Sequence, residues 1–527
     1  MRSYIYIPDM FKEFTYIFII FLVAMRYLAS EDIALNWDAP IFIEGSYLVF
    51  LNQIPNIDFS TPIGPLIFLI GGIGMKLSTP TIIGLNIGLM TFSAILLIGA
   101  LLLLKNFLSE RLFLFLAIFL ASLLFTPRML SGRTLDYAYT GVYNIYGYVL
   151  FFIATLLLFC NPREQKVLHH NGLAQNPTST GIAIGCLVVL SLFLKNIFSI
   201  GVFALGCSWI IFEANKIRYL KGLVIGGLLI LALFAFYYQF NFYPFIRDQL
   251  FVVQARLEES PFTRKDFLEV FWQKTWLDNL FILMTSIVAC LYVLKNRARL
   301  IAITLIYLLF GYLFCASIMQ FPEHILSSFF AFIVIFYVSQ PPAEDGSKSW
   351  LMITRPKLAS FIRFLLLLLS YLVILKFLVI NVAGLISDTP RLIKKGLPTY
   401  DLTESRKMTA AILPDIFVKN FNSTDEAIVV GENNMLPYQF FVVPKAGGLL
   451  YWHHQVTFTE KLAKSSDFFQ PENIFKSNKL IYLSMKNHAD SVSAFMGIYG
   501  DYINNNYYLA DFSEDIKVYK RNLEVGK

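Results

Sequence analysis

The chain has 527 residues, of which 57% are hydrophobic and only 15% are charged, and its mean hydropathy is +0.61. Soluble globular proteins carry about 25% charged residues, so the composition excludes an ordinary soluble protein and predicts a polytopic helical membrane protein. The net charge of +7 suits the basic bias of cytoplasmic loops, and we do not interpret it as nucleic-acid binding. The five cysteines lie in or beside apolar runs, so no disulfide framework is expected.

The apolar runs predict about eleven membrane-spanning helices, because a helix needs about 20 apolar residues to cross a bilayer. The first run is long and contains Arg26, so we interpret it as an uncleaved anchor. The predicted spans cover residues 12–29, 81–104, 112–127, 143–160, 180–194, 196–213, 219–240, 279–295, 300–319, 323–339 and 361–385.

The apolar run at 62–78 is ambiguous, and the distribution of basic residues decides how it is interpreted. If this run does not cross the membrane, the basic loops all lie on the cytoplasmic side, as the positive-inside rule requires. If it crosses, most of them face outward. We therefore expect a juxtamembrane or re-entrant helix here, with the N-terminus inside and the C-terminus outside. The basic loops are Lys105/Arg111, Arg163/Lys166, Lys216/Arg218/Lys221, Lys295/Arg297/Arg299 and Lys348/Arg355/Lys357.

Three pairs of glycines, each four residues apart, lie near the start of predicted helices. Small residues at this spacing permit two membrane helices to approach closely. Glycine is also common in membrane helices, so ordinary composition is the alternative explanation. The pairs are Gly84/Gly88, Gly181/Gly185 and Gly222/Gly226.

The chain divides into two predicted domains. Residues 1–385 form the transmembrane domain, with an acidic first outer loop at 30–62 and an aromatic, charged loop at 241–278 that is expected to form interfacial amphipathic helices. Residues 386–527 are more polar and predict a small α/β domain on the outer side. Its strand-like pieces are 427–431, 479–485 and 516–521.

The first outer loop contains several acids and no Lys or Arg. Asp38 is the candidate catalytic base, because a partly desolvated carboxylate can accept a proton from a hydroxyl or amine; the alternative is that it caps the helix behind Pro40. Glu44 is the second candidate catalytic residue; it falls on an apolar face and needs a cation, a metal or a polar substrate beside it. Asp58 is either a substrate-binding acid or the cap of the following turn.

Several basic residues are candidates for binding a phosphate at the outer surface. Lys195 interrupts a long apolar run at the outer end of a predicted tight hairpin, and intramembrane cations are functional candidates; snorkelling to the head groups is the alternative. Arg128 and Arg133 lie beside Asp136 in the outer loop 128–142. Guanidinium groups bind phosphate oxygens bidentately, although either arginine could equally be an interfacial anchor.

His324 follows Glu323 at the start of a late helix on the outer side. Capping of that helix explains the pair in structural terms. The functional interpretation is that His324 ligates a metal or orients a phosphate.

The segment WDAPIFIEGSYLVFLNQIPNIDFSTPIGPLIFL resembles the first outer loop of the GT-C glycosyltransferases, a superfamily that includes aminoarabinose lipid A transferases and protein O-mannosyltransferases. Asp38 matches the leading acid of that motif, Glu44 the second acid, and Asp58–Pro65 the turn. The usual Glu after the leading Asp is Ala39 here, and the Lys before the turn proline of the aminoarabinose transferases is Thr61. These departures argue against aminoarabinose transfer specifically.

Three further motifs carry the same resemblance, which covers most of the chain. SLFLKN resembles a short hairpin motif of the superfamily and places Lys195 at its lysine, and RTLDYA resembles the outer loop that contains Asp136. PEHILSSFFAFIVI resembles a late helix of the superfamily, without its internal prolines. A predicted outer soluble domain after many membrane helices is also similar to the domain order of the superfamily.

The resemblance implies an inverting glycosyltransferase that uses a sugar linked to a polyprenyl phosphate, with a lipid, glycan or protein acceptor on the periplasmic side of the inner membrane. Asp38 would deprotonate the acceptor or stabilise the oxocarbenium-like transition state, and Lys195 with Arg128 or Arg133 would neutralise the departing phosphate. No cofactor is required, although some relatives bind a divalent metal, for which Glu44 and His324 are the candidates here.

Other functions are compatible with the same residues. A flippase or transporter of a lipid-linked glycan would use these charges to guide its substrate, but no inverted repeat is detectable. A glycan polymerase or ligase would be expected to have one large outer loop late among its helices. A structural membrane subunit would use the outer domain only for docking.

Overall fold

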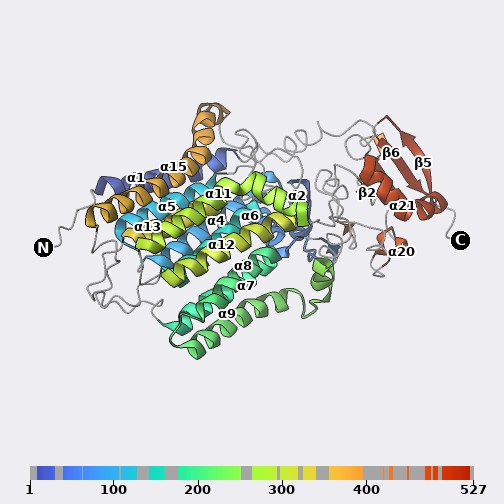
Figure 1. The fold of residues 1–527 in the computed structure, drawn as a ribbon. Coiled ribbons are helices and arrows are strands. Elements are labelled where there is room, and N and C mark those ends of the chain that lie inside the picture. The colour runs from blue at the N-terminus through green and yellow to red at the C-terminus, as the bar shows by residue number, and fades with distance from the viewer. Residues whose placement is uncertain are drawn as a thin grey trace.

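The computed structural model describes residues 9–29, 39–61, 63–105, 108–126, 142–160, 176–250, 264–292, 297–318, 325–339, 355–395, 419–420, 427–430, 448–449, 464, 469–475, 479–484, 489–514 and 516–522. Its long helices lie side by side in one bundle. A small sheet lies beyond the end of the bundle that is opposite to the N-terminus (Figure 1). This arrangement agrees with the predicted fold class, a polytopic helical membrane protein with a small C-terminal α/β part.

Each predicted membrane span overlaps one helix of the bundle. Five of the described helices are both long and apolar enough to cross a membrane, namely Ile82–Leu104, Val142–Phe159, Pro177–Leu194, Lys216–Tyr237 and Pro356–Ala383. The helices of the bundle are α1 (Asp9–Leu28), α2 (Ala39–Phe50), α3 (Pro65–Leu77), α4 (Ile82–Leu104), α5 (Glu110–Phe125), α6 (Val142–Phe159), α7 (Pro177–Leu194), α8 (Asn196–Trp209), α9 (Lys216–Tyr237), α11 (Arg264–Tyr292), α12 (Arg297–Ile318), α13 (Ile325–Ser339) and α15 (Pro356–Lys395).

The ambiguous run at 62–78 forms α3, a helix of 13 residues. A helix of that length extends about 20 Å, which is shorter than a hydrocarbon core of about 30 Å. Helix α3 packs against α2 on one side and α4 on the other. This supports the prediction of a juxtamembrane helix.

The loop 241–278, which was predicted to form interfacial helices, contains only one short separate helix among its described residues. Residues 243–250 are helical, but residues 264–278 continue without a break into the predicted span as α11. The hydrophobic run that predicted a start at residue 279 therefore marks only the apolar part of a longer helix.

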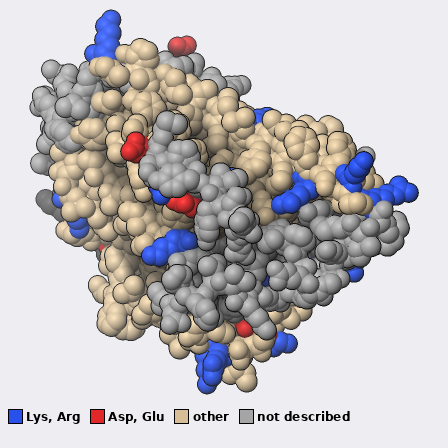
Figure 2. Space-filling view, turned by 90° about the vertical axis from the view of Figure 1, so that its left-hand side faces the viewer, with Lys and Arg blue, Asp and Glu red and all other residues tan. Residues whose placement is uncertain are grey.

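Basic side chains gather at the end of the bundle that carries the N-terminus. Figure 2 looks onto this end, and blue Lys and Arg side chains stand out around its rim with few red ones. At the same end an ion pair between Lys12 and Glu110, with Nζ and Oε1 2.6 Å apart, joins α1 to α5. The positive-inside rule predicts that this end is cytoplasmic, so the predicted orientation, with α2 and the sheet on the outer side, stays a prediction.

The glycine pairs do bring helices together. An added Cβ at Gly185 of α7 would lie 2.1 Å from the backbone oxygen of Leu223 in α9, and one at Gly226 would lie 2.0 Å from that of Ile182. No side chain fits in such spaces, so α7 and α9 are in direct backbone contact, as the glycine spacing predicts. Gly84 and Gly88 of α4 form a similar contact with Gly74 of α3.

Helix α6 is the central helix of the bundle, and every one of its residues is buried. Aromatic rings surround it: Phe152 stacks on Phe329 of α13 with centroids 4.1 Å apart, and Phe151 stacks on Phe310 of α12 at 4.4 Å. A helix that is apolar on all sides belongs in the interior of a bundle. This position fixes the outer end of α6, which is part of the candidate site.

The C-terminal sheet has the strand order β2-β4-β6-β5. Strands β2 and β4 pair in parallel, whereas β6 is antiparallel to both β4 and β5. Helix α21 (Ala489–Asn506) packs against the sheet through a core that includes Phe475, Phe495 and Tyr499. The strands are β2 (Ala427–Val430), β4 (Leu480–Ser484), β5 (Tyr507–Phe512) and β6 (Ile516–Arg521).

The strand-like pieces at 427–431, 479–485 and 516–521 are confirmed as strands β2, β4 and β6. Strand β5 was not predicted. It follows α21 without an intervening loop, and a run of asparagines and tyrosines gives no clear alternation before it.

Candidate active site

The structure describes three of the predicted site residues, namely Glu44, Asp58 and Lys195. Asp38, Asp136, Arg128, Arg133 and His324 lie outside the described residues, so their roles stay predictions. The site is therefore built from the three described residues and from the elements that surround them.

Lys195 lies between α7 and α8, where an extended backbone conformation ends one helix and begins the next. Its Nζ donates to Asn144 Oδ1 at 3.0 Å and to the hydroxyl oxygen of Tyr143 at 3.3 Å. The same ammonium group lies 4.6 Å from the centre of the Tyr143 ring. Lys195 is half-buried, and its contacts direct the charge toward the start of α6.

Two helix N-termini meet at this lysine. Helix α6 begins at Val142, directly before the two residues that contact Lys195, and α8 begins at Asn196, directly after it. The side chain of Lys195 does not cap α8. Helix N-termini carry unsatisfied N–H groups and partial positive charge, so the surroundings of Lys195 favour an anion.

The turn of the first outer loop packs directly on this hairpin. An added Cβ at Gly64 would lie 2.2 Å from the backbone oxygen of Phe193 and 2.6 Å from that of Leu194. Only glycine permits this approach. The turn that follows Asp58 is thereby held against the two residues that precede Lys195, so the structure brings two of the predicted motifs together.

Asp58 closes its own turn. Its Oδ2 accepts a hydrogen bond from the backbone N–H of Ile54 at 2.6 Å. This bond closes the turn that precedes Asp58, whereas the sequence predicted a cap of the turn that follows it, so neither that cap nor substrate binding by Asp58 is tested.

Glu44 is 2% exposed, and its charge is buried in the outer part of the bundle. Gly45 and Ser46 of α2 contact Phe68 and Gly71 of α3. Because a helix turns by about 100° per residue, Glu44 lies on the side of α2 that faces away from α3. It takes part in a polar or electrostatic interaction, as a buried carboxylate must.

A buried polar network joins the first outer loop to residues 243–250, and the sequence did not predict it. Asp248 is fully buried. Its Oδ2 accepts from Asn56 Nδ2 at 2.9 Å and from the backbone N–H of Thr61 at 3.1 Å. Its Oδ1 accepts from Nε and Nη2 of Arg247, at 2.9 and 2.7 Å. Tyr238 completes the network by donating to Asn56 Oδ1 at 3.0 Å.

Burial and hydrogen bonding act on Asp248 in opposite directions. Burial is the larger effect and raises the pKa of the Asp248 carboxyl above its ordinary value, whereas the Arg247 charge and the hydrogen bonds from Asn56 and Thr61 offset part of this rise. Four donors occupy the two carboxyl oxygens. The only sequence signal for this network was an Arg-Asp pair within an aromatic, charged outer loop.

The C-terminal part of the chain contacts the same network from the outside. Strand β1 (Phe59–Ser60) pairs in parallel with β3 (Gly448–Leu449). The guanidinium carbon of Arg247 lies 5.6 Å from the centre of the Phe469 ring. Both contacts fall within one residue of a member of the network, so the outer domain packs on the turn that leads to the candidate site.

A metal site is not formed by the described residues. Among them, no group of three His, Cys, Asp or Glu side chains is arranged to hold a metal ion. The partner predicted for Glu44, His324, lies outside the described residues. We therefore derive no chemistry through a metal.

Comparison with known proteins identifies the fold. No family model and no curated protein matches the chain. Among solved structures, ArnT from Cupriavidus metallidurans bound to undecaprenyl phosphate is similar with a TM-score of 0.52 at 11% identity, covering 97% of this chain and 98% of that one. The apo state of the same protein gives a TM-score of 0.50 at 11% identity, covering 96% and 98%. The chain thus shares the fold of these ArnT structures over nearly its whole length, in agreement with the fold that its motifs predicted.

Proposed function

We propose that the chain is a membrane glycosyltransferase that moves a sugar from a polyprenyl-phosphate donor to an acceptor on the outer side of the membrane. The observation that carries this proposal is the position of Lys195, a half-buried cation between the N-termini of α6 and α8 at the outer end of the bundle. The shared fold supports it, since the similar ArnT structure was determined with undecaprenyl phosphate bound.

The proposed reaction is one displacement at the anomeric carbon. A hydroxyl or amine of the acceptor attacks this carbon, and the bond from the carbon to the phosphate oxygen breaks. The polyprenyl phosphate leaves with the electron pair, and the configuration at the carbon is inverted. Asp38 takes the proton of the attacking group, a role that rests on its place in the acidic loop.

Lys195 is proposed to stabilise the negative charge that develops on the departing phosphate. Its ammonium group has three donor hydrogens, and Asn144 and Tyr143 orient it. In a site with little water, fixed charges of this kind are worth far more than in bulk solvent. Helix N-termini on both sides add to the positive potential without introducing a mobile charge.

The test uses purified protein in nanodiscs, with a panel of radiolabelled polyprenyl-phosphate sugars and extracted envelope acceptors. We expect sugar transfer by the wild type and a loss of about 10²–10³ in kcat for Lys195→Ala, the size seen when one charge-stabilising donor is removed. Asp38→Asn is expected to be inactive. Lys357→Ala, an exposed lysine at the cytoplasmic end, is the matched control and should retain activity.

Two outcomes would contradict the proposal. The first is transfer that is unchanged in both Asp38→Asn and Lys195→Ala. The second is no consumption of any donor, together with movement of labelled lipid across proteoliposome membranes, which would identify a flippase.

A further inference from the structure

An open groove lies at the outer end of the bundle, between the α2–α3 turn and the last turns of α9. Its volume is about 440 Å³, within the range of about 300–1,000 Å³ that is usual for small-molecule sites. Of the predicted site residues that the structure describes, Glu44, Asp58 and Lys195, none lines it. Ile54, Leu69 and Phe234 contribute to its apolar wall. Phe234 is held in place by stacking on Phe193, with ring centroids 3.6 Å apart.

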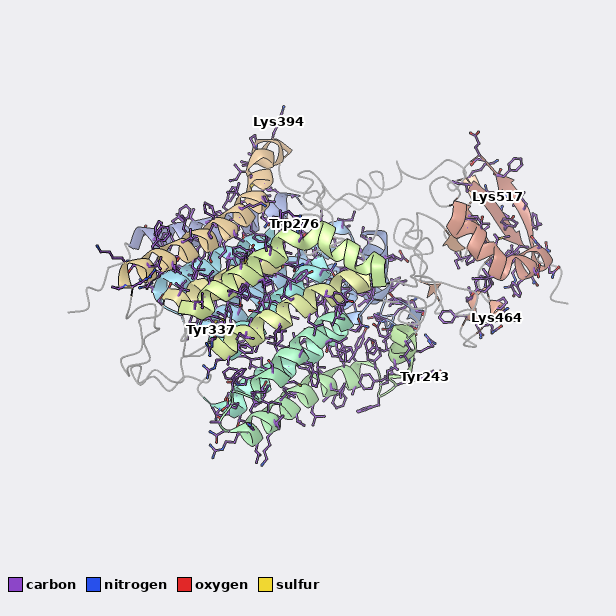
Figure 3. All side chains as sticks on the ribbon, in the orientation of Figure 1. Tyr243, Trp276, Tyr337, Lys394, Lys464 and Lys517 are labelled. Carbon is purple, nitrogen blue, oxygen red and sulfur yellow. The ribbon has the colours of Figure 1, made fainter. Side chains whose placement is uncertain are left out.

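The groove opens toward the surface that must contact lipid. Helix α9 is long and apolar enough to cross the membrane, and Leu233 and Phe236 near its outer end are 63% and 71% exposed. Leu233 also lines the groove, as does Ile73 of α3, which is 53% exposed. Tyr243, which Figure 3 labels at this outer end, is exposed as well. Exposed tyrosines are typical of the membrane–water interface.

Among the described residues, one cation and no acid line the groove. Lys76 lies in the last turn of α3, and its Nζ donates to Asn52 Oδ1 at 2.6 Å. An ammonium group has three donor hydrogens, so two are left for a ligand. The Asn52 backbone has φ of 67°, a left-handed conformation in which asparagine is enriched, and this sets the amide at the edge of the groove.

We infer that this groove binds one anionic phospholipid of the surrounding outer leaflet, with its phosphate on Lys76 and an acyl chain along Leu69, Ile73 and Leu233. The charge of Lys76 complements a phosphate, and the apolar walls complement the chain. The groove is continuous with the lipid-facing side of α9, so the lipid enters from the bilayer without passing through water. This inference does not depend on the proposed glycosyl transfer.

The test measures phosphatidylglycerol bound to detergent-purified protein by native mass spectrometry during a lipid titration. We expect the wild type to hold one phosphatidylglycerol more tightly than phosphatidylcholine. Lys76→Ala should weaken this binding about tenfold, as loss of one hydrogen bond to a charged group implies. Ile73→Trp, which places a large ring at the mouth of the groove, should weaken it at least as much.

Matched controls separate the groove from general effects. Ile95→Trp changes another exposed isoleucine, on α4, and Lys464→Ala changes an exposed lysine of the outer part (Figure 3); both should bind as the wild type does. Lys195→Ala should also bind normally, so a failure of the proposed transferase reaction would leave this result unchanged. Wild-type binding by both Lys76→Ala and Ile73→Trp would overturn the inference. The inference would also be overturned if the wild type held phosphatidylcholine as tightly as phosphatidylglycerol, or if inorganic phosphate displaced the bound lipid.

Discussion

The α7–α9 interface and the polar network around Asp248 hold the molecule together in opposite ways. Within the bundle, Gly185 and Gly226 let two helix backbones touch, with no charge between them. At the outer end, Asp248 is fully buried and is bound by four donors. Inside the membrane, apolar side chains are already out of water, so packing them between helices gains no hydrophobic free energy. The helices must therefore be joined by close packing. Where the chain leaves the membrane, a buried charge is tolerated only if its partners are complete.

The largest effect is expected at the polar network. Asp248→Ala would leave the Arg247 guanidinium buried without its carboxylate, and removal of one partner of a buried pair costs about 3–5 kcal/mol. We expect the largest drop in apparent melting temperature among the variants proposed here, measured as the monodisperse fraction left after heating in detergent. The double variant Arg247→Met with Asp248→Leu removes both charges and should recover part of the loss. A wild-type melting curve for Asp248→Ala would contradict the role of the network.

The second largest loss of stability is expected at the glycine contact between α7 and α9. In Gly226→Ala, the new methyl group would meet the backbone oxygen of Ile182 at 2.0 Å, so α7 and α9 must separate, at a cost of about 1–3 kcal/mol. Gly227→Ala is a matched control on the adjacent residue, because its nearest neighbour would lie at 3.6 Å, an ordinary contact. Equal melting temperatures for the two variants would show that backbone contact does not hold this interface.

A smaller effect is expected at Tyr238. Tyr238→Phe removes the hydrogen bond to Asn56 Oδ1 but keeps the ring within the aromatic cluster that includes Phe193. We expect a loss of about 1 kcal/mol, the usual net value of one hydrogen bond, in the same melting assay. Tyr243→Phe changes an exposed tyrosine and should have no effect. Equal losses of stability in Tyr238→Phe and Tyr243→Phe would show that the hydrogen bond to Asn56 does not contribute.

The smallest effect concerns the sheet, and it depends on pH. Hydrogen bonds from Asn420 and Lys419 lower the pKa of Asp511 on β5. A carboxyl whose folded pKa lies below its unfolded value stabilises the fold above that unfolded value, about 3.9 for Asp, and the contribution is lost as the pH falls through the folded pKa. The protection of β5 amides against exchange, corrected for the intrinsic pH dependence of the exchange rate, should therefore fall on acidification less in Asp511→Asn than in the wild type. Identical pH profiles would contradict this.

Part of the candidate site could be predicted from the sequence. The hairpin position of Lys195 followed from one cation within an apolar run, and the turn that precedes α3 followed from its prolines and glycine. The contacts of Lys195 with Tyr143 and Asn144 could not be predicted, because α6 lies about 50 residues earlier in the chain, and nothing local specifies which helix end faces the hairpin. The network partners Arg247 and Asp248 were missed for the same reason.

The sequence by itself determined the membrane class, the helices, the close approach at glycines and three strands of the sheet. These features depend on local composition and on the period of apolar residues. Only the tertiary structure decided that Asn56 meets Asp248, 192 residues away, that β1 pairs with β3, and that a groove opens beside Lys76. Such contacts depend on how the helices pack against one another, and no local pattern encodes them.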